Sequence, residues 1–173
     1  MSARPVAIVT GTGGIGTELA DLASEHGLRV ERFSAGLTAA IARHLPAYAA
    51  SGNPVDLTPV WRDYPRLYPL VLREIARSGE ADLIAVAISD VPTTWPDLAQ
   101  SLAEMAPGLG LPVAVYWASR DADVANMAPM QAAGVPVYRS TRDVVLALAT
   151  LAGSIGLTVV VWIVGYLAMG GPR

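Results

Sequence analysis

The chain has 173 residues, of which 53% are hydrophobic; its formal net charge is −3 and its mean hydropathy is +0.42. This composition predicts one domain with a substantial core rather than a disordered segment, and the absence of a basic cluster excludes nucleic acid as a partner. The chain contains neither cysteine nor lysine, which excludes a disulfide framework, a thiol nucleophile, a P-loop and Schiff-base chemistry.

Short apolar runs alternate with helical patterns through most of the chain. The predicted strands are residues 5–10, 28–33, 83–88, 112–117 and 135–138. The predicted helices are residues 17–25, 37–45, 64–77, 95–105, 121–133 and 142–152. Regular alternation of strand and helix predicts a parallel sheet with right-handed crossovers. We therefore expect a flavodoxin-like, doubly wound α/β domain over residues 1–152, with a five-stranded sheet in the order 2-1-3-4-5.

The clearest local motif is a glycine-rich turn between the first strand and the first helix, Gly-Thr-Gly-Gly-Ile-Gly at residues 11–16. Glycines permit a tight turn and leave backbone N–H groups uncovered at a helix N-terminus, which attracts phosphate or carboxylate. The phosphate-binding candidates are therefore Gly13, Gly14, Ile15 and Gly16. A plain tight turn without a ligand is the alternative.

A second alternative is an NAD-binding oxidoreductase domain. Glu31 lies 20 residues after Gly11, where an acid could bind a ribose. Against this interpretation, the predicted second strand is short and the chain lacks the lysine that short-chain dehydrogenases use. A solvated position at the end of a strand is the simpler interpretation of Glu31.

Several segments together resemble one known family. The segment RPVAIVTGTGGIG is followed about forty residues later by GNPVDLT, and later by LPVAV and AGVPVY. This series resembles the C-terminal flavodoxin-like, succinyl-CoA-ligase-like domain of NDP-forming acetate/acyl-CoA ligases. The resemblance covers residues 4–152.

The resemblance implies a role in phosphoryl transfer. In that family a histidine of a partner domain becomes phosphorylated, and the helix after the glycine turn directs its N-terminus at it. By the same resemblance Asn53 and Asp56 shape the adjacent loop; a turn residue and a turn cap are their purely structural alternatives.

Other parts of such a ligase are missing from the sequence. The SHTGS-type segment with the phosphorylated histidine, the ATP-grasp domain and the CoA-binding domain do not occur here. No catalytic residue and no metal site are therefore predicted. ATP or ADP, Mg²⁺ and CoA are implied only for an enzyme assembled with ATP-grasp and CoA-binding partners. A non-catalytic anion-binding or scaffold module is the remaining alternative.

The C-terminal segment departs from the family. Residues 153–170 read GSIGLTVVVWIVGYLAMG and carry no charge. We expect residues 153–173 to be a hydrophobic tail containing an apolar helix, covered by a membrane or by a hydrophobic partner. The N-terminus lacks the apolar region of a secretory signal, so the expected location is cytoplasmic, with membrane association through the tail as an option.

Overall fold

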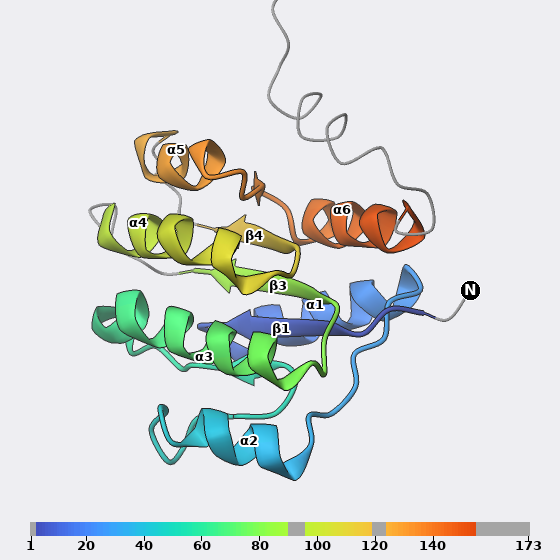
Figure 1. Ribbon diagram of the computed structural model, residues 1–173, viewed down its shortest axis with the longest axis vertical. Helices are drawn as coiled ribbons and strands as arrows, with labels where there is room; N and C mark the ends of the chain where they lie inside the picture. Colours follow the sequence, from blue (N-terminus) through green and yellow to red (C-terminus); the bar gives the residue numbers. More distant parts are fainter. Residues whose placement is uncertain (1–2, 90–95, 119–123, 155–173) are drawn as a thin grey trace, which may run out of the picture.

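The computed structural model describes residues 3–89, 96–118 and 124–154. Five parallel strands form one sheet in the order β2-β1-β3-β4-β5. The strands are β1 Val6–Thr10, β2 Val55–Asp56, β3 Leu83–Ile88, β4 Val113–Trp117 and β5 Val137–Tyr138. Figure 1 shows them stacked between the helices. The prediction of a flavodoxin-like, doubly wound sheet with this order is confirmed.

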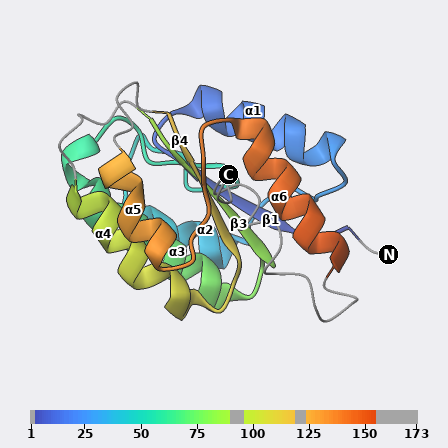
Figure 2. The same cartoon turned by 90° about the horizontal axis from the view of Figure 1, so that it is seen from above.

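Helices lie on both faces of the sheet. The α-helices are α1 Gly13–Glu25, α2 Ala35–Ala42, α3 Tyr64–Ser78, α4 Pro96–Met105, α5 Val124–Ala132 and α6 Thr141–Ser154. Two short 3₁₀ helices, η1 Trp61–Asp63 and η2 Ala106–Leu109, precede α3 and follow α4. Viewed from above, α1 and α6 lie on one side of the strands, and α3, α4 and α5 lie on the other (Figure 2).

The prediction for the second strand was wrong in its location. Residues 28–33 form only a single bridge, between Arg29 and Pro5. The strand beside β1 is instead β2, which pairs Val55 with Val9 and Asp56 with Thr10. Both segments compete for the same edge of β1, and the second segment occupies its carboxyl half. Val55 and Asp56, which were expected to lie in a loop, therefore form a strand of the sheet.

The first helix also begins earlier than expected. α1 starts at Gly13 rather than at Thr17, so the glycines of the turn form the first turn of the helix itself. The N-cap residue Thr12 has an extended backbone, with φ −145° and ψ 132°. The chain therefore changes from strand to helix within two residues after Thr10.

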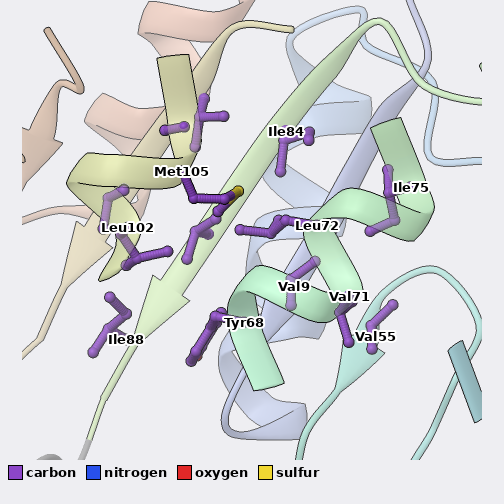
Figure 3. Packing of buried hydrophobic residues seen from close by; sticks show 14 of the residues in the cluster. Val9, Val55, Tyr68, Val71, Leu72, Ile75, Ile84, Ile88, Leu102 and Met105 are labelled. Atoms are coloured by element: carbon purple, nitrogen blue, oxygen red, sulfur yellow. The ribbon is translucent and has the colours of Figure 1, made fainter. Parts of the chain in front are cut away.

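Alternation along the strands divides the core into two layers. On one face Val9, Val55, Ile84 and Ile88 pack against α2, α3 and α4. Figure 3 shows the α3 side chains Tyr68, Val71, Leu72 and Ile75 directed toward these strand residues, with Leu102 and Met105 of α4 beside them. On the other face the core residues pack against α1 and α6; they include Val6, Ile8, Leu19, Ala85, Ala87, Val144 and Leu148. All six residues of β3 are buried, as expected of a central parallel strand.

The predicted apolar tail lies outside the described residues from position 155 onward. Helix α6 continues to Ser154, two residues past the predicted domain boundary at Ala152. The division into residues 1–152 and 153–173 thus stays a prediction. Within the part of the chain that the structure describes, no helix is long and apolar enough to cross a membrane.

Candidate functional site

The site residues predicted from the sequence, except Asn53, lie at the carboxyl edge of the sheet. Thr10, the last residue of β1, pairs with Asp56 of β2 on one side and with Ala87 of β3 on the other. The Leu57 N–H donates to the Thr10 carbonyl at 2.8 Å. The glycine turn and residues 56–58 therefore lie on the same edge. In doubly wound sheets this edge, near the switch between β1 and β3, is where ligands bind.

The residues of α1 do not provide acceptors for the backbone N–H groups at its N-terminus. The Thr12 side chain makes no capping hydrogen bond, and no acidic residue lies in the first turn. Gly13 and Gly14 are exposed. Among the described residues the N–H groups of Gly13, Gly14 and Ile15 have no acceptor. Such N–H groups carry the positive end of the helix dipole and suit an anion.

Gly16 differs from the other three phosphate-binding candidates. Its N–H donates to the Thr12 carbonyl at 3.3 Å, within the first turn of the helix. A Cβ on this buried residue would lie 2.9 Å from Thr10 Cγ2 and 3.2 Å from Pro54 Cβ. Gly16 therefore allows α1 to pack closely on β1 and the 52–58 segment, and its N–H already has an acceptor within the first turn of the helix.

The other glycines of the turn have different surroundings. A Cβ on Gly11 would collide with the hydroxyl and ring of Tyr64, whereas a Cβ on Gly14 would meet nothing within 4 Å. A Cβ on Gly13 would lie 3.0 Å from Asp56 Oδ2. The open space in front of Gly14 is the part of the turn that a ligand can approach.

Asp56 brings a carboxylate to the first turn of α1. Its Oδ1 accepts the Thr58 N–H at 2.9 Å, while its Oδ2 faces Gly13. Thr58 has φ 61°, a left-handed conformation that is rare for a β-branched residue. Asp56 thus caps a turn, which was the purely structural alternative for this residue. It also places a negative charge beside the first turn of α1.

Asn53 has a structural role. Its Oδ1 accepts the Ile8 N–H at 2.9 Å, and its Nδ2 donates to the carbonyls of Val6 at 2.9 Å and Glu31 at 3.0 Å. The side chain amide therefore provides β1 with the hydrogen bonds that a neighbouring strand would give. Asn53 holds the edge of β1 between the Arg29 bridge and β2.

Tyr64 joins the two loops of the site. Its hydroxyl lies 2.9 Å from the Thr58 carbonyl and 3.3 Å from the Gly11 carbonyl, and its side chain is 1% exposed. One helix residue thus fixes the spacing between the turn after β1 and the turn after β2. This role is not evident from the sequence, because a tyrosine at helical spacing indicates only a core position.

A buried hydroxyl at this edge was also not predicted from the sequence. Ser89 directly follows β3, is 4% exposed, and its Oγ has no hydrogen-bond partner among the described residues. Leu83, Ala85 and Ala87 face α1 and α6, so alternation places Ser89 on the same face. In the sequence, a serine that directly follows a wholly apolar strand indicates a buried hydroxyl at the carboxyl edge of the sheet.

Glu31, the residue of the dinucleotide alternative, does not end a strand. Its Oε1 pairs with Arg29 Nη1 at 3.2 Å, and its side chain is 58% exposed. The structure therefore lacks the strand that would place this acid against a ribose. Among the described residues no three histidine or acidic side chains gather where they could bind a metal ion.

Comparisons with known proteins place these features in a family. Residues 6–148 match the model of the Ligase-CoA domain. The chain is similar to the crystal structure of PH0766 from Pyrococcus horikoshii OT3, with 20% identity and a TM-score of 0.78, over 91% of this chain and 37% of that one. No curated protein sequence matches.

Two further solved structures are of the dinucleotide forming acetyl-coenzyme A synthetase 1 of Ca. Korarchaeum cryptofilum. The complex with phosphate and ADP shows 18% identity and a TM-score of 0.70, over 90% of this chain and 36% of that one. The apo form shows 17% identity and a TM-score of 0.71, over 91% and 36%. The chain thus spans little more than a third of the length of these neighbours.

Proposed function

Because the chain belongs to the Ligase-CoA domain family, we propose that it is a subunit or fragment of an NDP-forming acyl-CoA ligase and that the N-terminus of α1 stabilises a partner's phosphohistidine. The observation that carries this proposal is the first turn of α1. Its exposed glycines and three N–H groups without an acceptor among the described residues lie at the ligand-binding edge of the sheet.

The proposed role needs no side-chain chemistry from this chain. Gly13, Gly14 and Ile15 would donate backbone hydrogen bonds to phosphoryl oxygens, and the helix dipole would favour their negative charge. Such preorganised donors stabilise charge without reorganising during the reaction. The phosphoryl group would remain bonded to a partner's histidine while it is held here.

The remaining chemistry is assigned to partners. We assign ATP or ADP, Mg²⁺ and CoA to ATP-grasp and CoA-binding domains or subunits of the assembled enzyme. The lengths of the solved neighbours support this assignment, since the chain covers only 36–37% of them. The Korarchaeum enzyme, solved with phosphate and ADP, is a relative in which such a division is testable.

Reconstitution tests the proposed function. The full chain is mixed with ATP-grasp and CoA-binding subunits, and acyl-CoA formation from acid, ATP and CoA is measured together with histidine phosphorylation. We expect acyl-CoA only when this chain is present. If no combination yields acyl-CoA, and phosphorylated partner does not bind the chain, the proposed function is wrong.

A further inference from the structure

The N-terminus of α1 receives a negative charge from another element. The helix has neither a side-chain cap nor an acid in its first turn. Asp56 of β2 instead places its Oδ2 3.0 Å from the position of a Cβ on Gly13. A strand residue thus supplies the carboxylate that would usually belong to the helix itself.

This carboxylate is held in one orientation. Its Oδ1 accepts the Thr58 N–H at 2.9 Å, and the Thr58 carbonyl lies 2.9 Å from the Tyr64 hydroxyl. Thr58 keeps a left-handed backbone, with φ 61°, that disfavours a β-branched residue. The surrounding contacts therefore maintain an unfavourable conformation at the point where the carboxylate is fixed.

The same edge of the sheet also carries a buried hydroxyl without a hydrogen-bond partner among the described residues. The Ser89 side chain is 4% exposed and its Oγ has no partner among the described residues. It follows β3, next to β1 in the sheet, on the face that α1 covers. Leaving a buried hydroxyl unpaired costs free energy that a bound acceptor would recover.

We infer that Asp56 makes this site selective for a phosphoryl group carried on an imidazole over free inorganic phosphate. The inference rests on the proposed function, which supplies the phosphorylated histidine. A free phosphate carries no positive group, so the fixed carboxylate repels its net negative charge even when one of its O–H groups donates to Asp56. A phosphorylated imidazole takes up a proton on its second ring nitrogen, and that N–H can donate a charge-assisted hydrogen bond to Asp56.

Asp56→Asn in the full chain tests the inference. The amide keeps an oxygen that can accept the Thr58 N–H, so the turn is retained while the charge is lost. Binding of inorganic phosphate and of Nτ-phosphohistidine is measured by calorimetry at about pH 6.5, near the ordinary pKa of an imidazole. We expect the variant to bind phosphate about five- to tenfold more tightly and phosphohistidine more weakly by a similar factor.

Glu25→Gln is the matched control. Glu25 is the exposed last residue of α1, so this variant removes the same charge from the opposite end of the same helix. It should change neither affinity. Circular dichroism and the melting temperature establish that both variants are folded.

The outcomes distinguish failure of the specificity role of Asp56 from failure of the proposed function. If the natural chain binds phosphohistidine and Asp56→Asn binds it equally well, the specificity role is wrong while the proposed function stands. If neither the natural chain nor the folded variant binds either ligand, the anion site fails and the proposed function fails with it.

Discussion

At the scale of single residues, glycines of one turn serve different purposes. Gly11 leaves room for the Tyr64 side chain, Gly16 allows close packing on Thr10 and Pro54, and Gly14 faces open space. A motif written as GxGxxG does not distinguish these purposes. A substitution at Gly11 should therefore lower stability, whereas a bulky substitution at Gly14 should impair binding.

Gly11→Ala should destabilise the domain. The new Cβ would overlap the buried Tyr64 ring, and overpacking of this kind costs about 1–3 kcal/mol. Gly14→Ala, whose Cβ meets nothing within 4 Å, should leave the free energy of unfolding within about 0.5 kcal/mol of the natural chain or raise it. Urea unfolding of both variants measures the difference; equal losses would contradict the assigned packing.

Gly14→Val should abolish anion binding while the domain stays folded, because a side chain there would stand between the ligand and the backbone N–H groups. Gly36→Val is the matched control, since Gly36 is also the second residue of a helix, α2, and is exposed. Calorimetry with phosphohistidine measures both. Unchanged binding in Gly14→Val would remove Gly14 from the site.

Tyr68 should make the stability of the domain sensitive to alkaline pH. Complete burial raises its pKa well above 10.0, and its hydroxyl donates to the Ala87 carbonyl at 2.6 Å. The unfolded chain ionises this tyrosine first, so the stability is fully present below about pH 10 and is lost as pH rises toward the folded-state pKa.

Tyr68→Phe should therefore flatten the decline in unfolding free energy above about pH 10, by up to about 1.4 kcal/mol per pH unit. Burial also raises the pKa of Tyr138, so Tyr68→Phe should still show a smaller decline in unfolding free energy over this pH range. Tyr48→Phe, at a position 75% exposed, should leave the decline unchanged. Parallel curves for the natural chain and Tyr68→Phe would show that Tyr68 does not contribute.

At the scale of elements, a side chain completes the edge of the sheet. The Asn53 side chain accepts the Ile8 N–H and donates to the carbonyls of Val6 and Glu31. It lies at the point where the segment beside β1 changes from the Arg29 bridge to β2. The amide is suited to this position because it offers both a donor group and an acceptor. Neither an acid nor an apolar residue has both at neutral pH.

Asn53→Asp should lower the free energy of unfolding by about 1–3 kcal/mol at neutral pH, because two carbonyls lose their donor and face a carboxylate. Those carbonyls should hold the pKa of the new carboxyl above its ordinary value. Part of the loss should then disappear as pH falls below about 4, where the carboxyl is protonated. Denaturant unfolding at both pH values measures this; a loss independent of pH would contradict it.

At the scale of the whole molecule, the described core closes at α6. Helix α6 packs against α1 and the adjoining strands, and its buried residues include Thr141, Val144, Val145 and Leu148. The Thr141 hydroxyl also donates to Glu18 Oε1 of α1 at 2.6 Å. The five-stranded sheet has helices on both faces without the segment after Ser154.

A chain ending at Ser154 should accordingly fold, be monomeric and be more soluble than the full chain. The segment it lacks is uncharged from residue 155 to residue 172, and exposing such side chains to water is unfavourable. Circular dichroism, gel filtration and the melting temperature measure the result. Unfolding or aggregation of the shorter chain would show that residues 155–173 belong to the core.

The sequence by itself determined the alternation of strands and helices, the parallel sheet and the family; the order 2-1-3-4-5 was also expected, but with residues 28–33 as its second strand. These properties depend on local patterns: buried strands read as apolar runs, and helices show their period along one segment. The glycine turn was also evident, because its residues are adjacent in the chain.

Only the tertiary structure decided which segment lies beside β1, and it chose Val55–Asp56 over residues 28–33. It also decided that Asn53 completes the edge of β1, that Tyr64 joins two loops, and that Asp56 faces the first turn of α1. The physical reason is that each contact joins residues far apart in the chain. A local pattern records that a segment suits a strand or a helix, but competition for one edge is resolved by hydrogen bonds and packing formed when the segments meet.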